Sequence, residues 1–137
     1  MKNFHRIIMQ ILAISFISSA MAEDFYVRDL WGKEGGDTVD ISNSHQILYI
    51  SRKCKLPLQL KNSYKAAEMI FKEYNQRYEA CWIPLFPTGL IVIDENGGVH
   101  KDSEFGHFRV KSIGDGSFKV IGPMYNDYPN SPYKRKN

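Results

Sequence analysis

Residues 63–78 read Ser-Tyr-Lys-Ala-Ala-Glu-Met-Ile-Phe-Lys-Glu-Tyr-Asn-Gln-Arg-Tyr, and this stretch decides the fold that the sequence predicts. Five apolar or aromatic side chains recur in it at helical spacing: Ala67, Ile70, Phe71, Tyr74 and Tyr78. Such spacing places them on one face of an α-helix. Charged and amide side chains fill most of the other positions, and Asn62 or Ser63 can cap the first turn. The pattern therefore predicts an amphipathic helix over residues 63–78.

The two cysteines of the chain, Cys54 and Cys81, lie before and after this helix. Two cysteines in an oxidising compartment usually pair, although two free buried thiols are the alternative. A bridge between them encloses a loop of 28 residues. The chain-entropy account gives such a bridge about 3–4 kcal/mol of stability. We expect a Cys54–Cys81 disulfide that ties the two ends of the helix together.

Short runs rich in β-branched and aromatic residues predict strands on both sides of the helix. They cover residues 46–51, 90–93, 99–101, 107–111 and 117–121, with a further short strand inside 23–32. Residues 33–45 read as a loop. Asn96-Gly97 and Gly114-Asp115-Gly116 supply tight turns for two hairpins, and hairpins favour antiparallel pairing. The predicted fold class is α+β: one helix packed on a small antiparallel sheet, disulfide-bridged.

The N-terminus has the pattern of a cleaved signal peptide. Lys2 and Arg6 precede an apolar run over residues 7–17, and Ala20-Met21-Ala22 fits an A-x-A cleavage site. Eleven apolar residues are too few for a bilayer, which needs about 20. The sequence predicts a signal peptide over 1–22, a single α+β domain over 23–122, and an irregular, partly disordered tail over 123–137.

Charge gives little support for a nucleic-acid partner. The formal net charge is +3 at pH 7. Removal of Lys2 and Arg6 with the signal peptide lowers it to +1, and the remaining excess is local, at Lys134-Arg135-Lys136. We expect no nucleic-acid binding, and no transmembrane segment after maturation.

Candidate catalytic groups are few. His100 and His107 lie on or beside neighbouring predicted strands, with Asp102 and Glu104 between them. Imidazole and carboxylate groups are suitable zinc or copper ligands. The spacing matches no standard metal motif, so surface histidines on hairpins are the preferred interpretation and no cofactor is expected. A small metal-dependent or hydrolytic enzyme using these histidines and nearby acids is the alternative function.

Aromatic residues in irregular segments suggest a contact surface. Tyr125, Tyr128 and Tyr133 lie in the proline-containing tail, and Trp31 lies beside a glycine after the first predicted strand. Tyrosine and tryptophan are favoured anchors of protein interfaces. These four residues are the predicted interface.

Cys54, the predicted helix, Cys81-Trp82 and the hairpin from Leu90 to Val99 resemble a known pattern. It occurs in small uncharacterised exported proteins of Gram-negative bacteria, in which a Cys-helix-Cys-Trp segment precedes a hairpin with an acidic-Asn/Asp-Gly turn. The resemblance covers about 50 of the 115 residues after the predicted cleavage site. It implies a periplasmic or secreted location and the bridge, and it supplies no activity.

These observations predict an exported, non-enzymatic interaction protein of the bacterial envelope or exterior. An accessory subunit, an inhibitor or an immunity-type binder would fit. The expected partner is another envelope or secreted protein. Adhesion to glycans through exposed Trp and Tyr is a third possibility.

Overall fold

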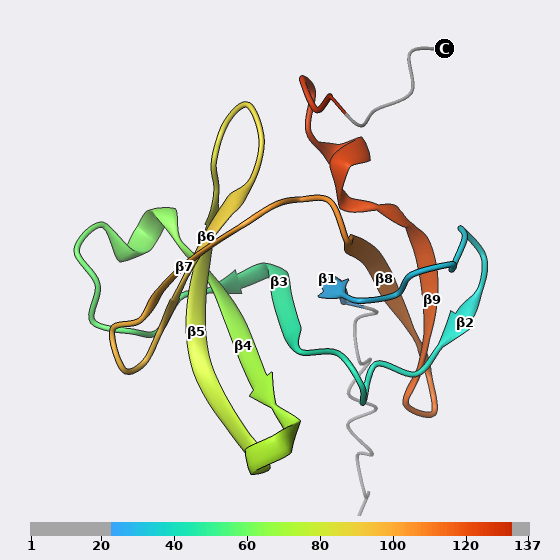
Figure 1. The fold of residues 1–137 in the computed structure, drawn as a ribbon, viewed down its shortest axis with the longest axis horizontal. Coiled ribbons are helices and arrows are strands. Elements are labelled where there is room, and N and C mark those ends of the chain that lie inside the picture. The colour runs from blue at the N-terminus through green and yellow to red at the C-terminus, as the bar shows by residue number, and fades with distance from the viewer. Residues whose placement is uncertain (1–22, 133–137) are drawn as a thin grey trace, which may run out of the picture.

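The computed structural model describes residues 23–132, and these form one antiparallel sheet of nine strands. In chain order the strands are β1 (Asp24–Arg28), β2 (Thr38–Val39), β3 (Gln46–Lys53), β4 (Lys65–Phe71), β5 (Gln76–Pro84), β6 (Leu90–Asp94), β7 (Val99–Asp102), β8 (His107–Gly114) and β9 (Ser117–Pro123). Across the sheet the order is β2-β9-β8-β1-β3-β4-β5-β6-β7. Figure 1 shows β4 to β7 on one side, β8, β9 and β2 on the other, and β1 and β3 between them. The predicted signal peptide, with Ala20 and Ala22, and Tyr133 lie outside the described residues.

The predicted helix over residues 63–78 is wrong, and with it the α+β fold class. These residues form β4 and the start of β5, which pair from Lys65 with Trp82 to Phe71 with Gln76. The helical segments in the described part of the chain are three short 3-10 turns: η1 (Lys61–Ser63), η2 (Lys72–Tyr74) and η3 (Met124–Asp127). None of them is long and apolar enough to cross a membrane.

The apolar residues within 63–78 fit both the helical repeat of 3.6 residues and the strand repeat of two, and this ambiguity explains the wrong prediction. Ala67 and Met69 are buried on one face of the sheet, as alternation in a strand requires. The helical pattern would bury Tyr74, but its side chain is 69% exposed. Asn75 ends η2 in the left-handed region (φ 48°), a conformation that Asn adopts more readily than most residues. A tight turn therefore replaces the middle of the expected helix.

The disulfide prediction is confirmed. Cys54 and Cys81 are bonded, with their Cα atoms 5.3 Å apart. Cys54 lies just after β3 and Cys81 lies inside β5. The bridge therefore links the loop after β3 to the centre of a strand, and does not tie the ends of a helix.

Local strand signals are mostly confirmed. Each of the six predicted strands overlaps an observed one, and the Asn96-Gly97 turn joins β6 to β7. The predicted loop over 33–45 also contains the short strand β2, which pairs with β9.

Both faces of the sheet carry apolar cores. One core includes Tyr26, Leu48, Trp82 and Leu90. The other includes Phe25, Val27, Ile47, Tyr49 and Val110. Neighbouring residues of β1 and β3 alternate between the two, as the pleat of a strand requires. The central strands thus contribute to a core on each side.

The sheet must curl strongly. Six strand spacings separate β7 from β8 in the sheet order, about 29 Å if the sheet were flat at ~4.8 Å per spacing. The chain covers this step from Asp102 to His107 in five residues, which reach at most about 18 Å. An ion pair 2.6 Å long between Arg28 Nη1 on β1 and Asp102 Oδ2 on β7 joins two strands that lie five spacings apart in the sheet order and that the curl brings together.

The segment after β9 packs back onto the sheet. Met124 in η3 and Tyr128 after it are buried in the core that contains Trp82. Tyr26 donates a hydrogen bond from its hydroxyl to Asp127 Oδ2 at 2.6 Å. This part of the predicted tail therefore has a fixed place in the fold.

Candidate functional site

Three aromatic rings from separate segments form a row at the end of the sheet where β7 crosses to β8. Trp31 follows β1, Phe105 lies in the β7–β8 link, and Tyr125 lies in η3. The ring centroids of Trp31 and Phe105 are 5.4 Å apart, and those of Phe105 and Tyr125 are 6.5 Å apart and stacked. We call Trp31, Phe105 and Tyr125 the aromatic row.

Backbone contacts hold the aromatic row in place. The Asp29 amide donates to the Gly106 carbonyl at 3.1 Å, which fixes the segment leading to Trp31 beside the β7–β8 link. Gly106 has φ +92°, and a Cβ there would lie 3.1 Å from the Trp31 ring. Glycine is favoured at this position, because the positive φ strains any other side chain and a Cβ would crowd the ring.

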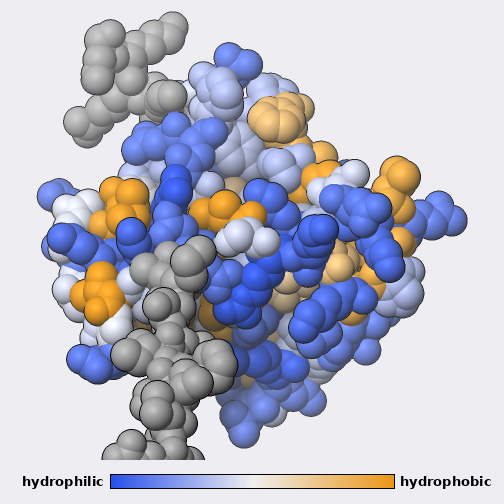
Figure 2. All heavy atoms as spheres, turned by 180° about the vertical axis from the view of Figure 1, so that it is seen from behind, coloured by the Kyte–Doolittle hydropathy of each residue, from blue (hydrophilic) through white to orange (hydrophobic). Residues whose placement is uncertain are grey.

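Two rings of the aromatic row are exposed to solvent, Trp31 at 58% and Phe105 at 46%, and Tyr125 is half-buried beside them. Two of the predicted interface residues, Trp31 and Tyr125, are thus brought together by Phe105, which the sequence reasoning missed. Tyr128 instead points into the core and is 4% exposed. Figure 2, which views the molecule from behind Figure 1, shows a mostly hydrophilic surface on which hydrophobic side chains appear in separate groups.

Another exposed aromatic residue, Phe86, lies in the β5–β6 loop and was not among the predicted interface residues. Its side chain is 74% exposed, and its ring centroid lies 6.0 Å from that of Tyr128. The loop closes through a hydrogen bond from the Leu85 amide to the Gly89 carbonyl at 2.9 Å. The uncharged run from Ala80 to Ile93 was the available signal.

A buried polar network lies below this loop. Glu104 is fully buried, and its carboxylate accepts hydrogen bonds from the Gly89 amide at 2.6 Å and from the Ser131 hydroxyl at 3.0 Å. The Tyr128 hydroxyl donates to the Gly89 carbonyl at 3.0 Å. Three segments remote in sequence therefore meet at Gly89.

His107 belongs to the interior. Its Nε2 lies 2.7 Å from Gln46 Oε1 and its Nδ1 lies 2.9 Å from the Ser103 carbonyl oxygen. Burial lowers the pKa of His107, because a charged imidazole loses its hydration there. Both ring nitrogens are thus used by internal contacts.

His100 lies on β7 with its Nε2 2.8 Å from Asp94 Oδ2. The hydrogen bond from His100 lowers the pKa of Asp94, helped by the amides of Gly98 and Asn96. Within residues 23–132, no group of three or more His, Cys, Asp or Glu side chains is arranged to hold a metal ion. His100 and His107 therefore lie in separate networks.

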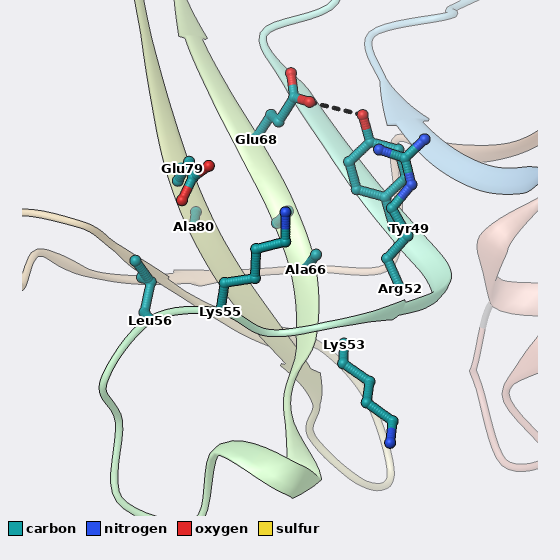
Figure 3. Close-up of a pocket in the computed structure, with 10 residues that line it drawn as sticks. Tyr49, Arg52, Lys53, Lys55, Leu56, Ala66, Glu68, Glu79 and Ala80 are labelled. Atoms are coloured by element: carbon teal, nitrogen blue, oxygen red, sulfur yellow. Dashed lines mark hydrogen bonds between the residues drawn. The ribbon is translucent and has the colours of Figure 1, made fainter.

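A small cavity of about 100 Å³ lies on the face of the sheet opposite Trp82, next to β3, β4 and β5. Figure 3 shows Glu68 pointing to the Tyr49 hydroxyl, which donates to Glu68 Oε1 at 2.7 Å. The Arg52 guanidinium lies 3.8 Å from the centre of the Tyr49 ring. Burial, followed by this hydrogen bond, raises the pKa of Tyr49 to about 12.

Two of the charged side chains around this cavity, Glu68 and Arg52, are held in ion pairs. Glu68 and Glu79 are direct cross-strand neighbours, an arrangement that like charges disfavour. Arg77 Nε lies 3.2 Å from Glu68 Oε2 and offsets the repulsion. Arg52 donates to both carboxylate oxygens of Glu23, from Nε to Oε1 at 2.9 Å and from Nη2 to Oε2 at 2.6 Å. We interpret this cluster as a network that stabilises the sheet face.

Comparison of the chain with protein-family models, curated proteins and solved structures gives no match. The candidate site is therefore defined by its own geometry, and the aromatic row is the feature that most favours recognition of a partner.

Proposed function

We propose that the chain is an exported binding protein of the bacterial envelope or exterior, and that it docks onto another protein without catalysing a reaction. The observation that supports this proposal is the aromatic row. The exposed rings of Trp31 and Phe105, held by a folded scaffold, provide apolar contact area at a low cost in side-chain entropy. An accessory subunit, an inhibitor or an immunity-type binder would use such a surface.

The disulfide supports the exported part of the proposal. The Cys54–Cys81 bond is compatible with an oxidising compartment, such as the periplasm or the exterior. The export signal itself, over residues 1–22, is a prediction from the sequence.

The test is a binding experiment with variants of the aromatic row. The tagged protein is incubated with native envelope extract and culture medium, and the partner is identified by mass spectrometry. We expect Trp31→Ala and Phe105→Ala to reduce recovery of that partner at least about 10-fold, as truncation of an interface hot spot does. Tyr74→Ala is the matched control, because Tyr74 is also an exposed aromatic (69%) and lies in η2, away from the row. Equal recovery with all three variants would refute the proposal.

Two other outcomes would favour a different function. Binding to a glycan array that is lost in Trp31→Ala, with no protein recovered, would favour carbohydrate adhesion. Stoichiometric zinc or copper that is lost in His100→Ala would favour the metal-dependent alternative. The internal contacts of His107 argue against the second outcome, because a ligating nitrogen would first have to leave its partner.

A further inference from the structure

The connection between β3 and β4 combines positive charge with leucine side chains. Residues 53–65 read Lys-Cys-Lys-Leu-Pro-Leu-Gln-Leu-Lys-Asn-Ser-Tyr-Lys, with four lysines, three leucines and no Asp or Glu. We call residues 53–65 the lysine–leucine loop. Its formal charge of +4 exceeds the net charge of +3 of the whole chain. Figure 1 shows it in green at the left edge of the fold.

Two contacts fix the base of the lysine–leucine loop. The Cys54–Cys81 disulfide ties its start to β5, and the Cys54 amide donates to the Tyr64 carbonyl at 3.2 Å. Within the loop, the Ser63 amide donates to the Leu60 carbonyl at 2.9 Å, which closes the turn of η1. A loop that is held in one conformation before binding loses little entropy when it binds.

Leu60 is exposed in a backbone conformation that favours other residue types. Its side chain is 81% accessible, the highest value among the large hydrophobic side chains of residues 23–132. Its backbone is left-handed, with φ 57° and ψ 29°, where the Cβ is crowded. The other described non-glycine residues with positive φ are Asp29, Asn75 and Asp115, and Asp and Asn tolerate this region best. Folding and solubility both disfavour leucine at this position, which indicates a role in binding.

The lysines of this loop have no acidic partner in the described part of the chain. The ion pairs formed there include every described arginine but none of the four lysines. Lys53 and Lys65 are direct cross-strand neighbours, an arrangement that like charges disfavour. Figure 3 shows the Lys53 side chain extending away from the carboxylates of Glu68 and Glu79. The loop therefore presents uncompensated positive charge together with the exposed Leu60.

An anionic lipid surface matches this combination. Its headgroups carry negative charge above an apolar layer, so lysines can remain among the headgroups while a neighbouring leucine enters the layer below. The methylene stems of lysine can lie against apolar groups while the ammonium group stays in water. A nucleic-acid backbone offers negative charge without an apolar layer beneath it. An acidic protein surface would need an apolar pocket placed among its carboxylates.

We propose that the lysine–leucine loop binds an anionic lipid surface, with the Leu60 side chain inserted below the headgroup phosphates and Lys53 and Lys61 beside them. Such binding is peripheral, and salt weakens it by screening the charges. The proposal goes beyond the binding protein proposed above and does not depend on the aromatic row, which lies on other segments of the chain.

Vesicle sedimentation tests the proposal. The full chain is mixed with phosphatidylglycerol–phosphatidylethanolamine vesicles or with neutral phosphatidylcholine vesicles, and the bound fraction is measured against lipid concentration. We expect binding to the anionic vesicles only, and less of it as the NaCl concentration rises. All variants share the same N-terminal residues, so the apolar run over residues 7–17 does not account for differences among them.

Two variants separate the leucine from the lysines. Leu60→Asn should lower the partition coefficient at least about 10-fold, the change that corresponds to burial of a leucine side chain. It should keep or raise the melting temperature, because Asn adopts the left-handed region more readily. Lys53→Gln/Lys61→Gln should lower the partition coefficient about 30-fold. The matched control is Lys111→Gln/Lys119→Gln, which removes two exposed lysines that are cross-strand neighbours on β8 and β9 and should have a much smaller effect.

Three results would overturn the proposal. They are a lack of preference for anionic over neutral vesicles, unchanged binding of Leu60→Asn, and equal losses in the two double-lysine variants. Capture of an acidic protein that depends on Leu60, without vesicle binding, would also overturn it and would assign the loop to a protein partner. Trp31→Ala separates this proposal from the proposed function, because it should lose the partner protein and bind vesicles as the wild type does. Failure of one experiment therefore leaves the other proposal standing.

Discussion

The buried carboxylate of Glu104 accepts a hydrogen bond from the backbone amide of Gly89 at 2.6 Å, and so joins the β7–β8 link to the loop between β5 and β6. The other carboxylate oxygen accepts from the Ser131 hydroxyl at 3.0 Å. One side chain thereby fixes two segments against the end of the curled sheet. The position of Phe86 depends on this contact, because Gly89 closes the loop that carries it.

Replacement of Glu104 by alanine should loosen that loop. Glu104→Ala leaves the Gly89 amide and the Ser131 hydroxyl without this acceptor, so the free energy of unfolding should fall by about 1–3 kcal/mol. Glu104→Gln should cost less, because its amide group can accept from Gly89 and donate to the Ser131 oxygen. Urea denaturation measures both values, and hydrogen exchange should show faster exchange of the Gly89 amide in Glu104→Ala. Unchanged stability and exchange in the alanine variant would contradict this account.

Local signals in the sequence predicted the hairpins correctly, whereas the predicted helix depended on a choice between two periods. The Asn96-Gly97 turn depends only on neighbouring residues, so the sequence predicts the β6–β7 hairpin correctly. In residues 63–78, the strand pattern of Ala67 and Met69 overlaps the helical pattern. Pairing of β4 with both β3 and β5 decides between them, and such partners cannot be read from the segment itself.

The candidate site was predictable only in part for a similar reason. Trp31 and Tyr125 were selected because aromatic residues in irregular segments suggest a surface. Their proximity depends on the curl that returns β7 to β8, which brings Phe105 between them. The exposure of Phe86 also depends on the tertiary structure, because an apolar run of this kind is equally typical of a buried strand.

The disulfide should contribute a large share of the stability. Cys54 and Cys81 are separated by 27 residues, and closing a loop of that length in the unfolded chain is worth about 3–4 kcal/mol. A Cys54→Ala/Cys81→Ala double variant, which leaves no free thiol, should lower the free energy of unfolding by roughly 2–5 kcal/mol. Intact mass before and after reduction verifies the bond in the wild type. Equal melting temperatures for the double variant and the wild type would refute this role.

Tyr49 should make the stability sensitive to alkali. Burial and the hydrogen bond to Glu68 raise the pKa of Tyr49 to about 12, from an ordinary value of 10.0. Its contribution is therefore fully present below about pH 10 and is lost as the pH rises toward 12, because the unfolded chain releases the proton first. Urea denaturation between pH 8 and 12 should show this loss in the wild type and a smaller one in Tyr49→Phe.

The Tyr49→Phe variant also loses the hydroxyl that satisfies Glu68, so at pH 8 it should be less stable by about 1–3 kcal/mol. Tyr74→Phe is the matched control, because Tyr74 is 69% exposed. Tyrosinate absorbance gives a second measurement, in which Tyr49→Phe should remove one late-titrating residue. A titration curve that changes only near pH 10 would contradict the environment described for Tyr49.

His107 should make the stability sensitive to mild acid. Its ring is fully buried, and burial lowers its pKa below the ordinary value of 6.5. The carboxylates of Asp102 and Asp29 oppose this shift, and the Arg28 guanidinium adds to it. A neutral ring donates from one nitrogen and accepts at the other. The Ser103 carbonyl oxygen can accept from Nδ1, so Nε2 then needs a donor, which Gln46 supplies if its side-chain amide turns over and its NH₂ takes the place of Oε1.

The neutral ring contributes stability above about pH 6.5, and this contribution is lost as the pH falls further, because the unfolded chain then binds a proton that the folded chain resists. His107→Gln cannot bind that proton, so its free energy of unfolding should fall less than that of the wild type between pH 7 and 5. The controls are His45→Gln and His100→Gln, whose side chains are 63% and 40% exposed and should leave the wild-type difference in place. Two-dimensional NMR of the imidazole nitrogens should show His107 less protonated at pH 6 than the exposed His45. A protonated ring at that pH, or parallel stability curves for wild type and His107→Gln, would show that the buried contacts favour the charged form.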